Sequence, residues 1–298
     1  MPYVKALDET ELYYRDWGFG LPVVLIHGWP LNGDMWERQA EFLAAHGLRV
    51  ITYDRRGFGR SGQSWSGYDY DTFASDLNQV MEYLNLQEAV LVGFSMGGGE
   101  VARYIGRYGT RRVSKTVLIG SITPFLLKTD DNPDGIDAEV FEEIEESIRE
   151  DRPSFLKDFA QKFYGRSVLS HPVSDSILDW TQIMALTSTL RPTLAAANAW
   201  SSTDFRDDLG AITVPTLVIH GTSDATVPIE KSAQLTVNLL PNGVLSEYGG
   251  EPHGLFITAS DRLNEELLAF IEGRPPTTIP VSELGLAGDL PLGEAVMP

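Results

Sequence analysis

The segment from Ala89 to Tyr108 constrains the fold of this chain more than any other. Its first residues, 89–92, are all apolar and predict a buried strand, while apolar residues at helical spacing from Val101 onward predict a helix. Between them lies Gly93-Phe94-Ser95-Met96-Gly97, and a Gly-x-Ser-x-Gly turn in that context exposes its Ser hydroxyl above the start of a helix. We expect a turn so tight that a side chain at position 93 or 97 would collide with the neighbouring strand or helix. A Gly-rich turn with a solvated Ser is the alternative.

Strands and helices alternate along the rest of the chain. The pattern over residues 2–17 predicts an antiparallel hairpin. Apolar runs predict further strands at 23–26, 50–53, 116–119, 216–219 and 244–248. Helical spacing predicts helices over 33–47, 72–84, 229–239 and 262–272. This alternation predicts an α/β fold with a mostly parallel sheet and helices on both faces.

The pattern changes between residues 122 and 206, which contain no convincing buried strand. Acidic amphipathic segments there predict helices over 137–150, 153–164 and 174–199. We therefore expect a core built from residues 1–121 and 207–273, with residues 122–206 forming an inserted helical cap. Residues 274–298 are rich in Pro, Gly and Leu, and we interpret them as an extended tail that wraps its own chain or a neighbouring subunit. A disordered terminus is the alternative.

Composition excludes several classes of function. The chain has 42 acidic and 23 basic residues, a formal net charge of −19 and no Lys/Arg cluster, so we expect no nucleic-acid or anionic-membrane partner. No stretch is apolar for the length of a membrane span. The absence of Cys excludes disulfides and thiolate chemistry, and the five His are too scattered to predict a metal site. No secretory signal is recognisable, and we expect a cytoplasmic protein.

Three residues have the types and positions of a nucleophile and its partners. A Ser hydroxyl needs a general base, usually an imidazole, and a carboxylate that orients the base. In a parallel α/β sheet, the residues able to meet lie in loops after the carboxyl ends of strands. Ser95, Asp224 and His253 satisfy this requirement, in the chain order of an α/β-hydrolase. Asp207 and Asp208 do not follow a strand and are weaker candidates, and a plain turn is the alternative role for Asp224.

Two backbone amides are expected to stabilise negative charge on a substrate oxygen. Met96 follows the nucleophile and supplies the first, and Trp29, in the loop after residues 23–26, supplies the second. Pro30 fixes its own backbone and should hold the Trp29 carbonyl near the site, where it could accept a hydrogen bond from hydrogen peroxide. The alternative role for Trp29-Pro30 is a rigid turn that only seals the core. His27 and His220 each precede a Gly at a strand end, and we expect structural roles for them.

Several motifs together resemble one known family. They are His27-Gly28-Trp29-Pro30, Asp54-Arg55-Arg56-Gly57-Phe58-Gly59-Arg60-Ser61, the segment from Gly93 to Tyr104, Pro215-Thr216-Leu217-Val218-Ile219-His220-Gly221 and Pro252-His253-Gly254. Over residues 3 to about 272 the chain resembles the cofactor-free, non-haem chloroperoxidase (perhydrolase) branch of the α/β-hydrolases, which also includes arylesterases and γ-lactamases. The resemblance implies esterase activity, and peracid formation from carboxylic acids and peroxide, with the peracid then oxidising halide away from any metal. It also implies trimers or pairs of trimers.

The sequence departs from this family in the tail and at Thr222-Ser223, where acidic residues are common before the Asp.

The predicted substrate is a small ester, a lactam, or a carboxylic acid with peroxide. A helical cap above Ser95 would form the acyl pocket, and ordinary packing within the cap is the alternative for each candidate wall residue. These candidates are Ile122, Phe125, Leu126, Phe141, Phe163 and Trp200. Cyclic amide hydrolysis, and a non-catalytic ligand-binding protein on the same fold, are the alternative functions.

Overall fold

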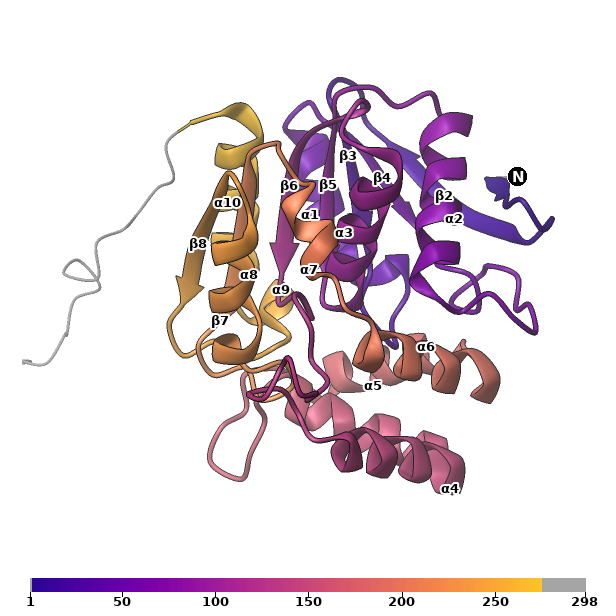
Figure 1. Cartoon of the computed structure of the whole chain (residues 1–298), viewed down its shortest axis with the longest axis vertical. Coiled ribbons are helices and arrows are strands. Elements are labelled where there is room, and N and C mark those ends of the chain that lie inside the picture. The colour runs from indigo at the N-terminus through magenta and orange to yellow at the C-terminus, as the bar shows by residue number, and fades with distance from the viewer. Residues whose placement is uncertain (1, 275–298) are drawn as a thin grey trace, which may run out of the picture.

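An eight-stranded sheet in the order β1-β2-β4-β3-β5-β6-β7-β8 forms the centre of the computed structural model, which describes residues 2–274 (Figure 1). β2 pairs antiparallel with β1 and β4, and all other pairs are parallel. The predicted hairpin and mostly parallel sheet are therefore confirmed. The strands are β1 (Tyr3–Lys5), β2 (Glu11–Trp17), β3 (Pro22–Ile26), β4 (Arg49–Tyr53), β5 (Ala89–Phe94), β6 (Val113–Ile119), β7 (Thr216–Gly221) and β8 (Gly243–Tyr248).

Both faces of the sheet are covered by helices, which explains the continuous apolar runs in its central strands. Val24 and Ile26 of β3 belong to one buried cluster, and Val23 and Leu25 belong to a second cluster on the opposite face. α2 (Tyr70–Tyr83), α3 (Met96–Tyr108) and α8 (Ala233–Leu239) contribute to the first cluster. α1 (Glu37–Ala45) and α10 (Ser260–Glu272) contribute to the second.

Shorter elements and caps complete the sheet's surroundings. The N-terminus of α2 is capped by Asp69, whose side chain accepts a hydrogen bond from the backbone N–H of Thr72. Short helical turns precede α1 and α8 and lie before β7 and α10, namely η1 (Gly33–Trp36), η2 (Ile229–Lys231), α7 (Arg206–Gly210) and α9 (Leu255–Thr258). Within residues 2–274, no helix combines the length and apolar character that crossing a membrane requires. Of the predicted tail, 274–298, all residues after Arg274 lie outside the described residues.

Three helices between β6 and β7 lie at the edge of the sheet where its parallel strands end (Figure 1). They are α4 (Ala138–Phe163), α5 (Asp175–Leu186) and α6 (Leu190–Ser202). α4 joins two predicted segments across a kink at Asp151, whose backbone is not helical, just before Pro153. The predicted helix 174–199 is instead two helices, because the backbone becomes extended at Thr189, between the end of α5 at Leu186 and the start of α6 at Leu190. The division into core and cap stays a prediction.

Candidate active site

Ser95 occupies a sharp turn between β5 and α3. Its φ of 54° and ψ of −118° are values that a residue with a side chain rarely adopts. A Cβ atom at position 93 would lie 2.4 Å from the carbonyl oxygen of Gly97, and a Cβ atom at position 97 would lie 2.5 Å from that of Ile26. The expected crowding of this turn is therefore confirmed, against the first turn of α3 on one side and β3 on the other.

The crowding at Gly97 predicts a large loss of stability in Gly97→Ala. Because the obstructing atom belongs to the backbone of β3, it can move only by distorting the sheet, and we expect the free energy of unfolding to fall by about 2–4 kcal/mol. Urea unfolding measures the effect. Gly210→Ala is the matched control, since no atom lies within 4 Å of the added methyl. Equal stability of the two variants would contradict this reading of the turn.

Asp224 and His253 are joined by a short hydrogen bond. His253 Nδ1 lies 2.6 Å from Asp224 Oδ2, and both side chains are buried. The other carboxylate oxygen accepts the backbone N–H groups of Thr226, at 2.9 Å, and Val227, at 2.8 Å. Burial alone would raise the pKa of Asp224, but the charge of His253 and the hydrogen bonds from His220 and His253 outweigh it and hold that pKa well below its usual range. The ionised carboxylate thus directs the Nδ1–H of His253 toward itself and leaves Nε2 as an acceptor.

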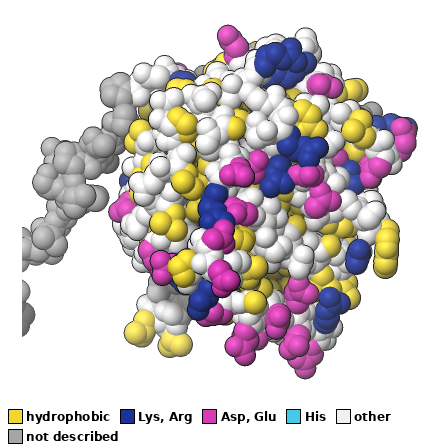
Figure 2. Space-filling model, in the orientation of Figure 1, with side chains coloured by type: hydrophobic (Ala, Val, Ile, Leu, Met, Phe, Trp, Pro, Cys, Tyr) yellow, Lys and Arg dark blue, Asp and Glu magenta, His cyan; other side chains and the backbone are white. Residues whose placement is uncertain are grey.

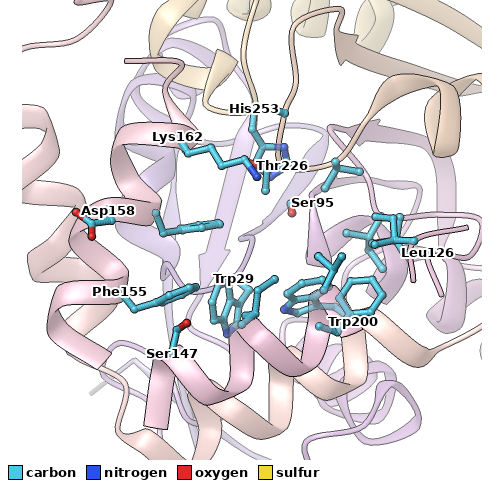
Figure 3. Close-up of a pocket in the computed structure, with 18 of the residues that line it drawn as sticks. Trp29, Ser95, Leu126, Ser147, Phe155, Asp158, Lys162, Trp200, Thr226 and His253 are labelled. Atoms are coloured by element: carbon cyan, nitrogen blue, oxygen red, sulfur yellow. The ribbon is translucent and has the colours of Figure 1, made fainter. Parts of the chain in front are cut away.

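His253 and Ser95 line the same cavity. The ring of His253 packs against that of Phe94, with centroids 4.8 Å apart, and Phe94 immediately precedes Ser95. Figure 3 shows His253 next to Ser95 at one end of the cavity. The structure therefore brings together Ser95, Asp224 and His253, which are 29 or more residues apart in sequence, at the carboxyl ends of β5, β7 and β8.

The other histidines near these strand ends are held in fixed hydrogen bonds. His27 Nδ1 lies 2.9 Å from the Gly28 carbonyl oxygen, and its Nε2 accepts the backbone N–H of Arg55 at 2.9 Å. Burial, and then the charge of Arg55, lower the pKa of His27 well below its usual value. His220 Nε2 lies 2.8 Å from the Val227 carbonyl oxygen and 3.2 Å from Asp224 Oδ2, so its N–H is shared between these two acceptors. Both side chains therefore have the structural roles expected from the sequence.

The Met96 backbone amide directly follows Ser95, and Gly28, the residue before Trp29, packs against Ser95, since a Cβ atom at position 28 would lie 3.1 Å from the Ser95 Cβ. Met96 is the first residue of α3, and Trp29 lies in the turn that the Leu31 N–H closes onto the Gly28 carbonyl at 3.0 Å. Within residues 2–274, neither amide donates a hydrogen bond to a backbone or side-chain acceptor. The Trp29 indole is fixed separately, since its Nε1–H donates to the Thr193 carbonyl in α6 at 3.0 Å. Two unused donors beside a nucleophile are what an oxyanion requires.

A buried ion pair supports the loop that carries Trp29. The Arg55 guanidinium lies 2.6 Å from Glu100 of α3 and donates to the His27 carbonyl at 2.9 Å. Tyr53 also donates to Glu100. Arg55 and Glu100 are fully buried, and burial lowers the pKa of Arg55 to about 10, so the guanidinium stays charged near neutral pH. The pair connects the ends of β3 and β4 with the first turns of α3.

This arrangement predicts that removing one partner of the pair is more damaging than removing both charges. Arg55→Met leaves Glu100 buried without its cation, and we expect the free energy of unfolding to fall by about 3–5 kcal/mol. Adding Glu100→Gln should recover part of that loss, because a neutral amide costs less to bury than a lone carboxylate. Urea unfolding of both variants tests this. A double variant that is less stable than Arg55→Met would contradict it.

A cavity of about 800 Å³ opens from Ser95 and His253 toward α4 and α6 (Figure 3). Four of the predicted wall residues line it, namely Ile122, Leu126, Phe141 and Trp200. Trp29 also lines it, with its ring centroid 5.4 Å from that of Phe159 and 5.8 Å from that of Trp200. The floor of the cavity is therefore largely aromatic.

Two predicted wall residues do not line the cavity. Phe163 is 1% exposed because it packs beneath the site, with its ring centroid 5.0 Å from that of His253 and 5.9 Å from that of Phe94. Phe125 faces Arg206 instead, with the guanidinium carbon 5.3 Å from its ring centroid. The prediction of these two residues as acyl-pocket walls is wrong, and the position of Phe163 makes it a support for the His253 ring.

Other lining residues were missed by sequence reasoning. Phe155 and Phe159 of α4 are one helical turn apart and belong to the apolar side of that helix, a signal that could have identified them. Thr226 and Lys162 also line the cavity. The sequence alone does not indicate whether a single hydroxyl or ammonium group faces the cavity or the solvent. Within residues 2–274, no group of three His, Asp or Glu side chains is placed to hold a metal ion.

Comparison with known proteins agrees with this geometry. A family model described as alpha/beta hydrolase fold matches residues 22–260. The chain therefore belongs to the α/β-hydrolase family and is an enzyme of the esterase type. Within that family it belongs to the branch that contains non-haem chloroperoxidases and haloperoxidases.

Relatives of this branch match nearly the whole described chain. A non-haem haloperoxidase from Rhodococcus erythropolis is 44% identical over 275 residues, covering 91% of this chain and 100% of the relative. A bifunctional esterase/perhydrolase from Acinetobacter calcoaceticus is 42% identical over 275 residues, covering 91% of this chain and 99% of the relative. The crystal structure of a bromoperoxidase from Bacillus anthracis matches with a TM-score of 0.87 at 47% identity, covering 90% of this chain and 99% of that one.

Proposed function

We propose that this protein is a serine esterase that works through an acyl-enzyme and also forms peracids when hydrogen peroxide replaces water. The observation that carries the proposal is the 2.6 Å link from Asp224 to His253, together with the cavity that His253 and Ser95 both line. The relative from Acinetobacter calcoaceticus, whose name states both activities, supports the second of them.

The proposed reaction has two halves. Ser95 Oγ attacks the ester carbonyl while His253 Nε2 takes its proton, and the Trp29 and Met96 amides stabilise the oxyanion. His253 then gives the proton to the departing alcohol, which leaves an acyl ester on Ser95. In the second half, water or hydrogen peroxide attacks that ester and passes a proton to His253, and the acid or peracid departs as Ser95 regains the proton. Asp224 orients the imidazole throughout.

The shape of the cavity supports a broad range of acyl groups. A volume of about 800 Å³ with aromatic walls exceeds what an acetyl group needs, so apolar or aromatic acyl chains should also fit. Peroxide placement by the Trp29 carbonyl, and assembly into trimers or hexamers, stay predictions from sequence.

Burst kinetics test the proposal directly. An acyl-enzyme predicts a rapid release of about one nitrophenol per active site from p-nitrophenyl acetate when deacylation is the slower half. Peracid formation is measured in parallel from acetate and peroxide with a halide acceptor, and a bicyclic γ-lactam tests cyclic amide hydrolysis. Tight substrate binding with no product from any of these would instead favour a non-catalytic ligand-binding protein.

A further inference from the structure

Lys162 is the single Lys or Arg among the described residues that line the cavity of Ser95 and His253. It belongs to the last turn of α4, one turn after Asp158. Figure 3 shows its side chain reaching from α4 toward His253 and Ser95, whereas Asp158 lies farther from them on the rim of the same cavity. Within residues 2–274, no carboxylate forms an ion pair with this ammonium, although Asp158 is at the spacing that would allow one. The ammonium thus faces the cavity that Ser95 and His253 also line.

The other charged side chains that line this cavity are acidic. Glu150, Asp151 and Asp158 stand on the rim that α4 forms, and acidic side chains gather along the lower edge of the molecule in Figure 2, where α4 lies in Figure 1. With a net charge of −19, the protein repels anions at long range. A single positive charge beside the reacting centre therefore provides a local attraction that the rest of the surface does not.

We infer that Lys162 selects substrates that carry a carboxylate on the alcohol side of the ester. The inference rests on the proposed esterase function. His253 must face the departing oxygen to protonate it, and Lys162, His253 and Thr226 lie at one end of the cavity in Figure 3, away from Trp29, Phe155 and Trp200. The apolar end thus receives the acyl chain, and the ammonium meets the alcohol portion.

Matched aryl acetates separate charge from size. 3- and 4-Acetoxybenzoate carry the carboxylate on the departing phenol, and their methyl esters are neutral counterparts. The measured quantity is the ratio of kcat/KM for the anionic substrate to kcat/KM for the neutral one. Comparing this ratio between variants cancels the difference in phenol basicity between the two substrates. Lys162→Met removes the charge and keeps much of the side-chain length, and we expect the ratio to fall about 3- to 10-fold for at least one isomer.

Three further variants make the result decisive. Lys162→Arg should retain most of the ratio, and Asp158→Asn should raise it, because it removes a negative charge from the same rim. Lys157→Met is the matched control, since Lys157 belongs to α4 but lines a separate depression with Gln161 and Asp175. The Lys162→Met effect should also shrink as salt is raised from about 0.05 to 0.5 M, because the ammonium is exposed at the rim.

Two outcomes would overturn the inference. If Lys157→Met and Lys162→Met lower the ratio equally, the change in the overall charge of the protein causes the effect. Lys162 then does not determine substrate specificity. If Lys162→Met leaves the ratio unchanged, the carboxylate does not meet the ammonium. Either result differs from a failure of the proposed esterase function, because in that case wild-type protein would cleave neither the neutral nor the anionic acetate.

Discussion

Ser95→Ala should lose the hydrolysis of p-nitrophenyl acetate by at least about 10³-fold in kcat, together with the burst of nitrophenol. The substitution deletes only Oγ, the atom proposed to form the acyl ester. The Cβ atom stays, and so do the backbone bond from the Ser95 N–H to the Ile119 carbonyl and the tight turn around Gly93 and Gly97. The amides of Trp29 and Met96 are also retained, so any residual rate reports what they achieve without a nucleophile.

Two measurements accompany that variant. Urea unfolding should show nearly the same stability as wild type, which separates lost chemistry from a lost fold. Peracid formation should fall in parallel with hydrolysis, because both are proposed to use one acyl-enzyme. A Ser95→Ala protein that keeps a tenth of the wild-type rate would show that another group is the nucleophile.

Asp224→Asn should lower kcat by about 10³- to 10⁴-fold, the size of effect known for this change in trypsin-like enzymes. The remaining oxygen can still accept the Thr226 and Val227 amides, so the loop should hold its shape. An amide NH₂ facing His253 Nδ1 would favour the tautomer with the proton on Nε2, which cannot accept the proton of Ser95. A kcat loss of less than tenfold would show that Asp224 does not orient His253.

The same variant should change how stability responds to acid. The pKa of Asp224 in the folded protein is held below its unfolded value of about 4, so this carboxylate stabilises the fold above that pH. The contribution is lost as the pH falls and the folded carboxyl becomes protonated. Wild-type stability should therefore fall more steeply below about pH 4 than that of Asp224→Asn, as measured by urea unfolding at several pH values. Parallel curves for the two proteins would contradict this linkage.

The positions of Ser95, Asp224 and His253 could be predicted because each lies in the loop or turn that follows a parallel strand, namely β5, β7 and β8. Strand ends are readable from apolar runs, and a parallel sheet brings those ends to one edge. The wall of the cavity was less predictable. Helical spacing on α4 identifies an apolar side but not how far along the helix that side meets the cavity, so Phe163 was chosen where Phe155 and Phe159 line it.

The charged residues of the cavity could not be predicted from the sequence, for a different reason. Lys162 follows an ordinary amphipathic pattern in which a solvated lysine is the usual outcome. The break near Asp151 was predicted, but how the part of α4 after that kink rests against the strand ends is not encoded in residue spacing. The break between α5 and α6 was also missed, because the apolar spacing continues across Thr189, where the backbone is extended.

Trp29 connects helix α6 to the proposed oxyanion hole. Its indole is tethered to the Thr193 carbonyl of α6, while its own main chain forms one side of the proposed oxyanion hole. Any adjustment of α6 to a larger guest is therefore transmitted mechanically to the groups that tune the reaction barrier. Substitutions in α6 that enlarge the cavity should therefore change kcat as well as substrate affinity. The range of substrates and the catalytic rate cannot evolve independently through this helix.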